Sequence, residues 1–162
     1  MKVLKWLDEH FEELLLGIFT VIMVIVTAAQ VFMRFVLENS LTWSEELARY
    51  SFIWLVYLGI SYGVKKQRHI KIDAVFLLLK DKGKIVLAIV GNLLFLAFAI
   101  FVLVYGYDIA MKLLTWGQTS PALHIPVGLV YLAGPVGMGL TAIRLLQQLF
   151  QQGKELFKKE LT

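Results

Sequence analysis

The sequence predicts an all-α membrane protein with four transmembrane helices, both termini in the cytoplasm, and short amphipathic interfacial helices. Of its 162 residues, 59% are hydrophobic and 17% are charged, and residues 14–33 and 85–107 carry no charge at all. Runs of this length match the roughly 20 residues that cross a hydrocarbon core. The basic residues are also unevenly placed, with thirteen in the two termini and the loop at 65–84 and three elsewhere. The positive-inside rule then places the termini and this loop in the cytoplasm.

The whole chain, residues 1–162, is interpreted as a single membrane domain. The expected spans are residues 14–36, 43–64, 85–108 and 126–146, joined by a cytoplasmic basic loop at 65–84 and a periplasmic loop at 109–125. Residues 1–13 mix aromatic and charged side chains, which predicts a short amphipathic entry to the first helix. Because no small-residue cleavage site follows the first apolar run, this span is expected to be retained and not removed as a signal peptide.

The second span must draw charges to the membrane interface. Its uncharged run, residues 50–64, is about 22 Å long as a helix, short of the roughly 30 Å of a hydrocarbon core. A spanning helix therefore begins near Trp43, which places Glu45, Glu46 and Arg49 at a depth where unpaired charge is costly. Thr42 and Glu45 have the spacing of a capping box, so Thr42 is predicted as the N-cap.

A neutral charge network is the hypothesis for this first hairpin. Arg34 lies about as far before the outer turn as Glu45 and Glu46 lie after it, and with Arg49 the four charges sum to zero. Such a network would fix the hairpin and present polar groups to a partner. The alternative is a set of separately solvated side chains, with arginines that extend to the interface.

Small residues and prolines mark three further features. Gly59 and Gly63 have the spacing that lets another helix approach closely, although glycine is also common in membrane helices by chance. Residues 74–79 are too short to span and are predicted to form a surface helix; capping of this helix by Asp73 is the local alternative to a contact with a partner. In the fourth span, Pro126 suits the first helical turn, and Gly134-Pro135 is expected to kink the helix at mid-depth.

Several function classes are disfavoured. No span carries a carboxylate or lysine near its centre, where transporter cores hold ionisable groups, and Gln30 and Asn92 are interpreted as interhelical hydrogen-bonding residues. The three histidines lie at span edges, which argues against a haem carrier, and the absence of cysteine excludes thiolate metal sites. No enzyme motif or cofactor site is recognised, and the net charge of +4 is assigned to lipid contact and not to nucleic acid. The residues predict an accessory or scaffold subunit.

Several segments resemble the small membrane subunit of tripartite ATP-independent periplasmic (TRAP) transporters, the DctQ-like family. The matching segments are Gln30-Val31-Phe32-Met33-Arg34, Trp43-Ser44-Glu45-Glu46-Leu47-Ala48-Arg49-Tyr50, Trp54, Gly59, His69-Ile70-Lys71-Ile72-Asp73, Ser120-Pro121-Ala122-Leu123 and Ile125-Pro126. The resemblance covers nearly the whole chain. It implies a non-catalytic subunit of the bacterial inner membrane that scaffolds a large, elevator-type M subunit.

The same resemblance implies that sodium and solute bind on the large subunit, and that a periplasmic substrate-binding protein delivers an organic acid such as a C4-dicarboxylate or sialic acid. Trp43, Glu45, Glu46 and Arg49 match the family motif on the outer hairpin, and His69 and Asp73 match it on the inner side; whether they contact a partner or one another is left open. Because the chain ends after the fourth span, the separate-subunit form is expected. The alternative is a self-associating four-span scaffold or a small multidrug-type exporter.

Overall fold

The computed structural model describes residues 2–66 and 81–160, and these residues are almost entirely helical. The helices are α1 (Lys2–Phe35), α2 (Thr42–Lys65), α4 (Asp81–Thr115), α5 (Val127–Tyr131) and α6 (Ala133–Glu160). Within the described residues there is no β-strand, only an isolated bridge between Thr119 and Pro126. Among these residues, four segments are long and apolar enough to cross a membrane, which confirms the predicted all-α, four-span fold. His69, Asp73 and the surface helix expected at 74–79 lie outside the described residues.

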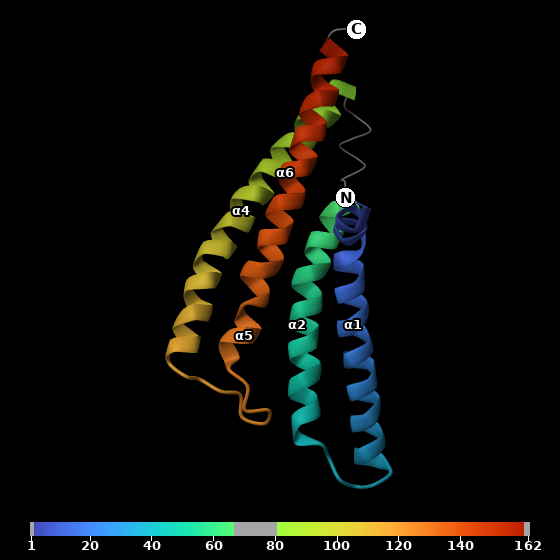
Figure 1. Cartoon of the computed structure of the whole chain (residues 1–162), viewed down its shortest axis with the longest axis vertical. Helices are drawn as coiled ribbons and strands as arrows, with labels where there is room; N and C mark the ends of the chain where they lie inside the picture. Colours follow the sequence, from blue (N-terminus) through green and yellow to red (C-terminus); the bar gives the residue numbers. More distant parts are fainter. Residues whose placement is uncertain (1, 67–80, 161–162) are drawn as a thin grey trace.

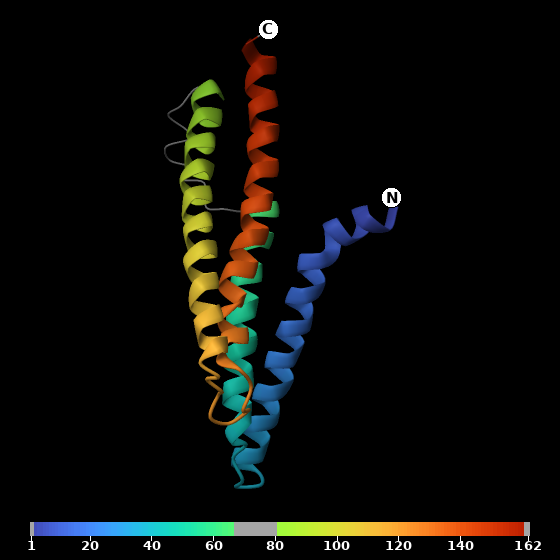
Figure 2. The same cartoon turned by 60° about the vertical axis from the view of Figure 1, so that its left-hand side comes forward.

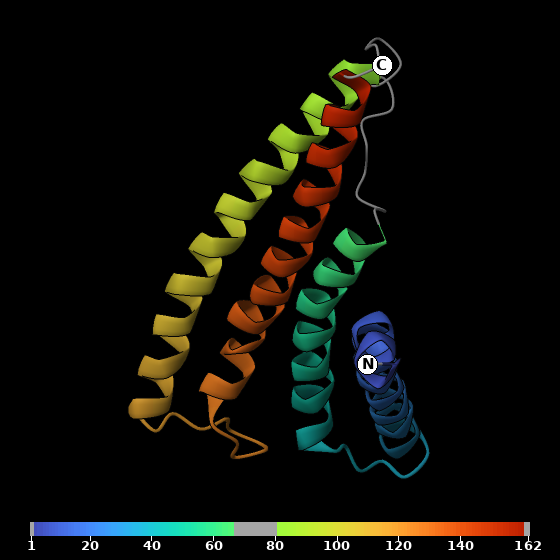
Figure 3. The ribbon, with the colours of Figure 1, turned by 45° about the horizontal axis from the view of Figure 1, so that its top comes forward.

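The helices stand side by side in one open row, in the order α1, α2, α6, α4 (Figures 1 and 3). Within the candidate spans, 50% of the most apolar window of the fourth span is buried, against 6% for the first and the third. The fourth span, formed by α5 and α6, is therefore the centre of the row, while α1 and α4 are its edges. Both chain termini lie at one end, called here the terminal end, and the connections 36–41 and 116–126 lie at the other, the loop end (Figure 1).

The first hairpin consists of α1 and α2. Phe19 and Trp54 stack between these helices with ring centroids 5.9 Å apart, and Gln30 hydrogen-bonds the Ser44 hydroxyl, as expected of an interhelical polar residue. The predicted capping box is wrong: the N-cap of α2 is Leu41, without a side-chain cap, and Thr42 is already helical. Ser44 in the first turn does not cap the helix either, since its hydroxyl donates to the Leu41 carbonyl at 2.7 Å.

The second hairpin consists of α4 with α5 and α6. Gly117, with φ of +64°, ends α4 in a Schellman motif. Its N–H donates to the Leu114 carbonyl, and the N–H of Gln118 donates to the Leu113 carbonyl. Pro126 precedes α5 as its N-cap and does not lie in its first turn. The helix is interrupted at Leu132, between α5 and α6, because Pro135 has no backbone N–H to donate to the preceding turn. The predicted kink therefore exists, but it lies close to the loop end and not at the middle of the span.

The two hairpins meet where α2 packs against α6, called here the α2–α6 seam. A Cβ added at Gly137 would lie 2.7 Å from the backbone oxygen of Tyr57, so glycine is needed for this close approach. The glycine pair predicted to serve this purpose lies elsewhere. A Cβ at Gly59 would only touch Leu16 of α1, at 3.9 Å, and Gly63 faces open space. Their role toward another protein stays a prediction.

The row is uneven at the terminal end. Figure 2 shows that the first turns of α1 bend away from the row, and that α4 and α6 extend well beyond the end of α2. In this extension, Asn92 of α4 donates to Gln152 at 3.1 Å and approaches Gln148 at 3.4 Å. This confirms the interpretation of Asn92 as an interhelical hydrogen-bonding residue.

Candidate functional site: two buried carboxylates

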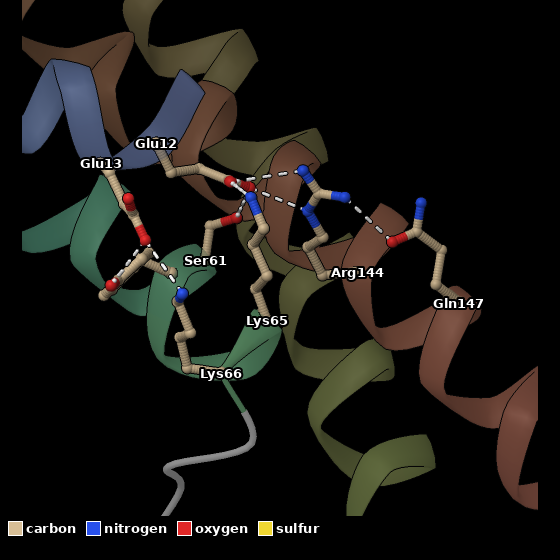
Figure 4. Close-up of polar contacts among 8 residues, drawn as sticks. Glu12, Glu13, Ser61, Lys65, Lys66, Arg144 and Gln147 are labelled. Atoms are coloured by element: carbon tan, nitrogen blue, oxygen red, sulfur yellow. Dashed lines mark hydrogen bonds and ion pairs between the residues drawn. The ribbon is translucent and has the colours of Figure 1, made fainter. Parts of the chain in front are cut away.

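Glu12 is the centre of a buried ion cluster at the terminal end (Figure 4). Its side chain is 0% exposed although it is ionisable. Arg144 of α6 donates through Nε to Oε1 at 2.8 Å and through Nη2 to Oε2 at 3.3 Å. Lys65 Nζ of α2 lies 2.6 Å from Oε2, and the Ser61 hydroxyl donates to Oε1 at 3.3 Å. One carboxylate thus joins three helices, and each of its oxygens has at least two donors.

A second, exposed pair lies beside this cluster. Glu13 Oε1 lies 3.0 Å from Lys66 Nζ and accepts a hydrogen bond from the Tyr62 hydroxyl at 3.0 Å (Figure 4). The hydrogen bond and the negative charge of Glu13 raise the pKa of Lys66 above its ordinary value. Because both side chains are well exposed to solvent, this pair contributes little compared with the Glu12 cluster.

Burial requires the Glu12 carboxylate to have close hydrogen-bonding or cationic partners, since an isolated buried charge is very costly. The antiparallel hairpin brings Glu12, near the start of α1, level with Lys65, the last residue of α2. The α2–α6 seam then brings Arg144 to the same level. Arg144 is also held from its far side, because its Nη1 donates to Gln147 at 3.0 Å. The geometry of the cluster, with one carboxylate bound from three helices, is suited to holding these helices together and not to reaction with a solute.

Glu46 is the second buried carboxylate, and it lies at the loop end. Its side chain is 3% exposed, and its Oε2 accepts the backbone N–H groups of Ala122 at 3.0 Å and Leu123 at 2.8 Å. The Tyr50 hydroxyl donates to Oε1 at 2.6 Å. Glu46 therefore ties the start of α2 to the connection between α4 and α5. All three of these partners are uncharged donors. The Glu46 carboxylate is therefore held by hydrogen bonds, and none of these contacts is with a cation.

The connection 116–126 is folded so that it offers these two N–H groups together. Ser120 is buried, its N–H donates to the Ile125 carbonyl at 2.8 Å, and its own carbonyl accepts from His124 at 3.1 Å. His124 adopts a φ of +54°, the left-handed conformation that allows so tight a turn. The turn leaves the N–H groups of Ala122 and Leu123 free to point at Glu46.

The predicted neutral network of four charges does not form. Arg34, Glu45 and Arg49 are exposed, and in the described part of the chain no ion pair includes any of them. The Arg34 guanidinium instead lies 5.8 Å from the Phe35 ring centre. The prediction failed because backbone N–H groups of a distant loop, which leave no mark in side-chain patterns, satisfy Glu46. Trp43 is 40% exposed and, like the three exposed charges, keeps its partner role as a prediction.

Sequence reasoning missed the Glu12 cluster altogether, although a signal was present. Glu12 lies two residues before the first apolar run, Lys65 immediately follows the second, and Arg144 immediately follows the fourth. The charge count already assigned all three positions to one side of the membrane. One acid and two bases at the same level of three spans predict an ion cluster, whereas they were interpreted only as topology signals.

The described residues offer no obvious place for a cofactor or metal. Among them, no three histidine or carboxylate side chains are grouped closely enough to hold a metal ion. Every buried side-chain nitrogen or oxygen in the described residues also has a hydrogen-bond partner. The buried polar groups are thus engaged in holding the helices together, and none is left aimed at a bound solute.

Comparison with known proteins gives consistent matches. The family model described as "Tripartite ATP-independent periplasmic transporters, DctQ component" matches residues 23–155. The chain is 36% identical over 158 residues to the isethionate TRAP transporter permease protein DctMQ of Oleidesulfovibrio alaskensis, which covers 93% of this chain but 25% of that protein. It is 30% identical to the ectoine TRAP transporter small permease protein TeaB of Halomonas elongata, over 96% of this chain and 79% of that protein. It is 27% identical to the C4-dicarboxylate TRAP transporter small permease protein DctQ of Vibrio cholerae, over 88% of this chain and 71% of that protein.

Proposed function

Because the chain belongs to the DctQ component family of tripartite ATP-independent periplasmic (TRAP) transporters, we propose that it is the non-catalytic small membrane subunit of such a transporter. In this proposal it forms a fixed wall beside a large M subunit, which binds sodium and solute and moves. A periplasmic binding protein delivers the solute. The relatives are named for isethionate, ectoine and C4-dicarboxylates, so the family alone does not decide the solute, and we propose an organic acid.

One observation carries this proposal: in the described spans, charged side chains lie near the ends of each helix, and the central part of each helix has none. Residues 14–33, 50–64, 85–107 and 127–143 are free of Asp, Glu, Lys and Arg. Secondary transporters place ionisable or broken-helix groups near the midplane, where they bind ions and solute. The break at Leu132 lies near the loop end instead. A chain built this way supports a transporter without forming the transport path.

The open row gives further support. Large apolar side chains are exposed along both edges, such as Phe32 on α1 at 55% and Phe98 on α4 at 53%. A single row of helices cannot enclose a path for a solute by itself, because each of its two broad faces is open (Figure 3). In a membrane such faces are covered by lipid or by the helices of another protein.

Reconstitution with the cognate large subunit and binding protein tests the proposal. We expect the small chain to copurify with the large subunit in mild detergent. Vesicles holding both should take up solute when the binding protein and a sodium gradient are supplied, and vesicles holding the small chain alone should not. Accumulation of solute by the small chain alone, or its purification as a lone homodimer that ignores the large subunit, contradicts the proposal and favours an exporter or a self-associating scaffold.

The proposed inner-membrane orientation has its own test. The chain contains no cysteine, so single cysteines can report the side on which each end lies. Gln118→Cys in the loop-end connection should react with an impermeant thiol reagent from the periplasm, while Lys154→Cys near the end of α6 should react only after the cells are opened. The reverse pattern contradicts the orientation with both termini in the cytoplasm.

A further inference from the structure

An apolar groove runs along the free edge of α1. It has a volume of about 680 Å³, and residues of α1 and the turn directly after it form its entire lining. Val24, Ala28, Val31 and Phe35 line it at intervals of four, three and four residues, the spacing at which one helix packs along another. All four are exposed, from 52% for Val31 to 75% for Phe35 among the large ones. The groove therefore has the shape and spacing to receive a helix that the row does not supply.

The opposite edge of the row has a different surface. On α4 the exposed face carries Phe98, Phe101 and Tyr105, and the last two rings lie 4.6 Å apart. Large side chains keep a neighbouring helix at a distance, whereas small residues such as Ala28 let helix backbones approach closely. On the α1 edge such a small residue, Ala28, lines an apolar groove.

The charge at one end of the groove decides what kind of partner fits. Arg34, next to Phe35, is exposed and forms no ion pair with the described residues. Two copies of this chain, inserted in the same direction, would meet across an axis normal to the membrane and place their Arg34 side chains at equal depth. Two like charges near the membrane interface repel each other. The groove therefore disfavours a second copy and favours a different protein with a negative group at that depth.

We propose that the α1 groove receives a transmembrane helix of the large M subunit, which carries a carboxylate opposite Arg34. This rests on the proposed function. The chain aligns with only 25% of the isethionate permease DctMQ, so in that relative a much longer partner sequence is joined to the matching part. A permanently associated partner of this kind is the occupant that the exposed edge and its arginine fit.

Photocrosslinking in the assembled transporter tests the contact directly. A photoreactive phenylalanine derivative is introduced at position 28, in the groove, or at position 97, an exposed alanine on α4. We expect position 28 to form an adduct with the large subunit far more efficiently than position 97. An adduct between two small chains at position 28, adducts with lipid alone, or a stronger adduct at position 97 each overturn the proposal.

Paired substitutions give a second measurement. Ala28→Phe fills the groove and should lower the amount of copurified large subunit about tenfold. A tenfold loss of affinity corresponds to ~1.4 kcal/mol, which is within the usual cost of overpacking. Ala97→Phe makes the same change at the other edge and should leave the complex intact. Arg34→Glu should weaken the complex, and Arg34→Lys should largely retain it. Equal recovery of the complex with Ala28→Phe and with the unchanged chain overturns the groove assignment.

The two proposals fail in distinguishable ways. If the unchanged chain copurifies with the large subunit but the groove variants and crosslinks show no contact, the groove assignment is wrong and the scaffold role stands. If the unchanged chain never copurifies with the large subunit, the proposed function fails first.

Discussion

Glu12 at the terminal end and Glu46 at the loop end are both buried carboxylates, yet their partners differ in kind. Glu12 faces two cations on side chains, Lys65 and Arg144, that come from two other helices. Glu46 faces two backbone N–H groups and a tyrosine hydroxyl. The first arrangement depends on three charged residues that must all be present. The second depends on the conformation of one connection, whatever side chains that connection carries.

Both carboxylates nevertheless perform one task, because both cross from the first hairpin to the second. Glu12 links α1 to α6, two helices that otherwise have little contact, and Glu46 links α2 to the connection before α5. Between them the α2–α6 seam is closed by Gly137 against Tyr57. The row is thus held at both ends and at its middle. We expect these contacts to make the row stiff without a large apolar core, which suits the proposed role as a fixed wall.

Of the substitutions that test this comparison, removal of the Glu12 carboxylate should have the largest effect on stability. Glu12→Ala removes the carboxylate that Arg144 and Lys65 both contact, and breaking a buried ion pair costs about 3 kcal/mol or more. We expect a large drop in the unfolding midpoint of the detergent-solubilised chain. Glu13→Ala, one residue away, removes an exposed carboxylate and should change the midpoint little. If the two variants unfold alike, the cluster does not hold the terminal end.

A substitution at the seam shows whether the middle of the row matters as much as its ends. Gly137→Ala places a Cβ 2.7 Å from the Tyr57 backbone oxygen, so α2 and α6 must move apart, at about 1–3 kcal/mol for overpacking. Gly63→Ala adds the same methyl group in open space and should leave stability unchanged or raise it slightly. Thermal unfolding of both variants measures the difference. Equal stability of the two would show that the seam tolerates separation.

Loss of the Glu46 charge should act locally, at the loop end. Glu46→Gln keeps one oxygen as an acceptor but places an amide NH₂ near two N–H donors, so it weakens their hold on the loop. Hydrogen exchange at Ala122 and Leu123 should become several-fold faster, with a smaller change in global unfolding than Glu12→Ala causes. Glu45→Gln, an exposed neighbour, is the matched control and should leave exchange unchanged. Protection that persists in Glu46→Gln would contradict the role given to this carboxylate.

The exposed pair next to the Glu12 cluster should show the smallest effect. Lys66→Gln removes a partially exposed cation, so stability near neutral pH should hardly change. The folded chain holds the Lys66 proton more tightly than the unfolded chain does, because Glu13 raises the pKa of Lys66. Its small contribution is therefore present below the unfolded value of about 10.5 and is lost as the pH rises through the raised pKa. A difference between Lys66→Gln and the unchanged chain that grows toward acid pH would contradict this assignment.

The fold was largely predictable, because long uncharged runs leave few alternatives to membrane helices. The pairing roles of Gln30 and Asn92 were also predictable, since polar side chains within apolar helices need partners. The N-cap of α2, in contrast, could not be predicted from the sequence. It is Leu41, one residue before the predicted Thr42, and the nearby Ser44 hydroxyl bonds Gln30 of α1, a contact that exists only once the two helices have met.

The site was harder to predict than the fold, for two physical reasons. Glu46 was among the candidate site residues, but its partners are backbone N–H groups more than seventy positions away, which depend on the turn around Ser120. Glu12 was misjudged because its position suggested a solvated helix entry. The packing of α2 against both α1 and α6 brings Arg144 within reach of Glu12.

The central claim is that the two hairpins form one rigid unit while the partner moves. A distance across the seam tests it most directly, with spin labels on Phe52→Cys in α2 and Ile100→Cys in α4, two exposed positions in a chain without cysteine. The distance distribution is recorded by pulsed electron paramagnetic resonance for the complete transporter in vesicles, at rest and during solute uptake. We predict one narrow distribution that is the same in both states. A shift of its maximum, or a second population that appears during uptake, would contradict the account.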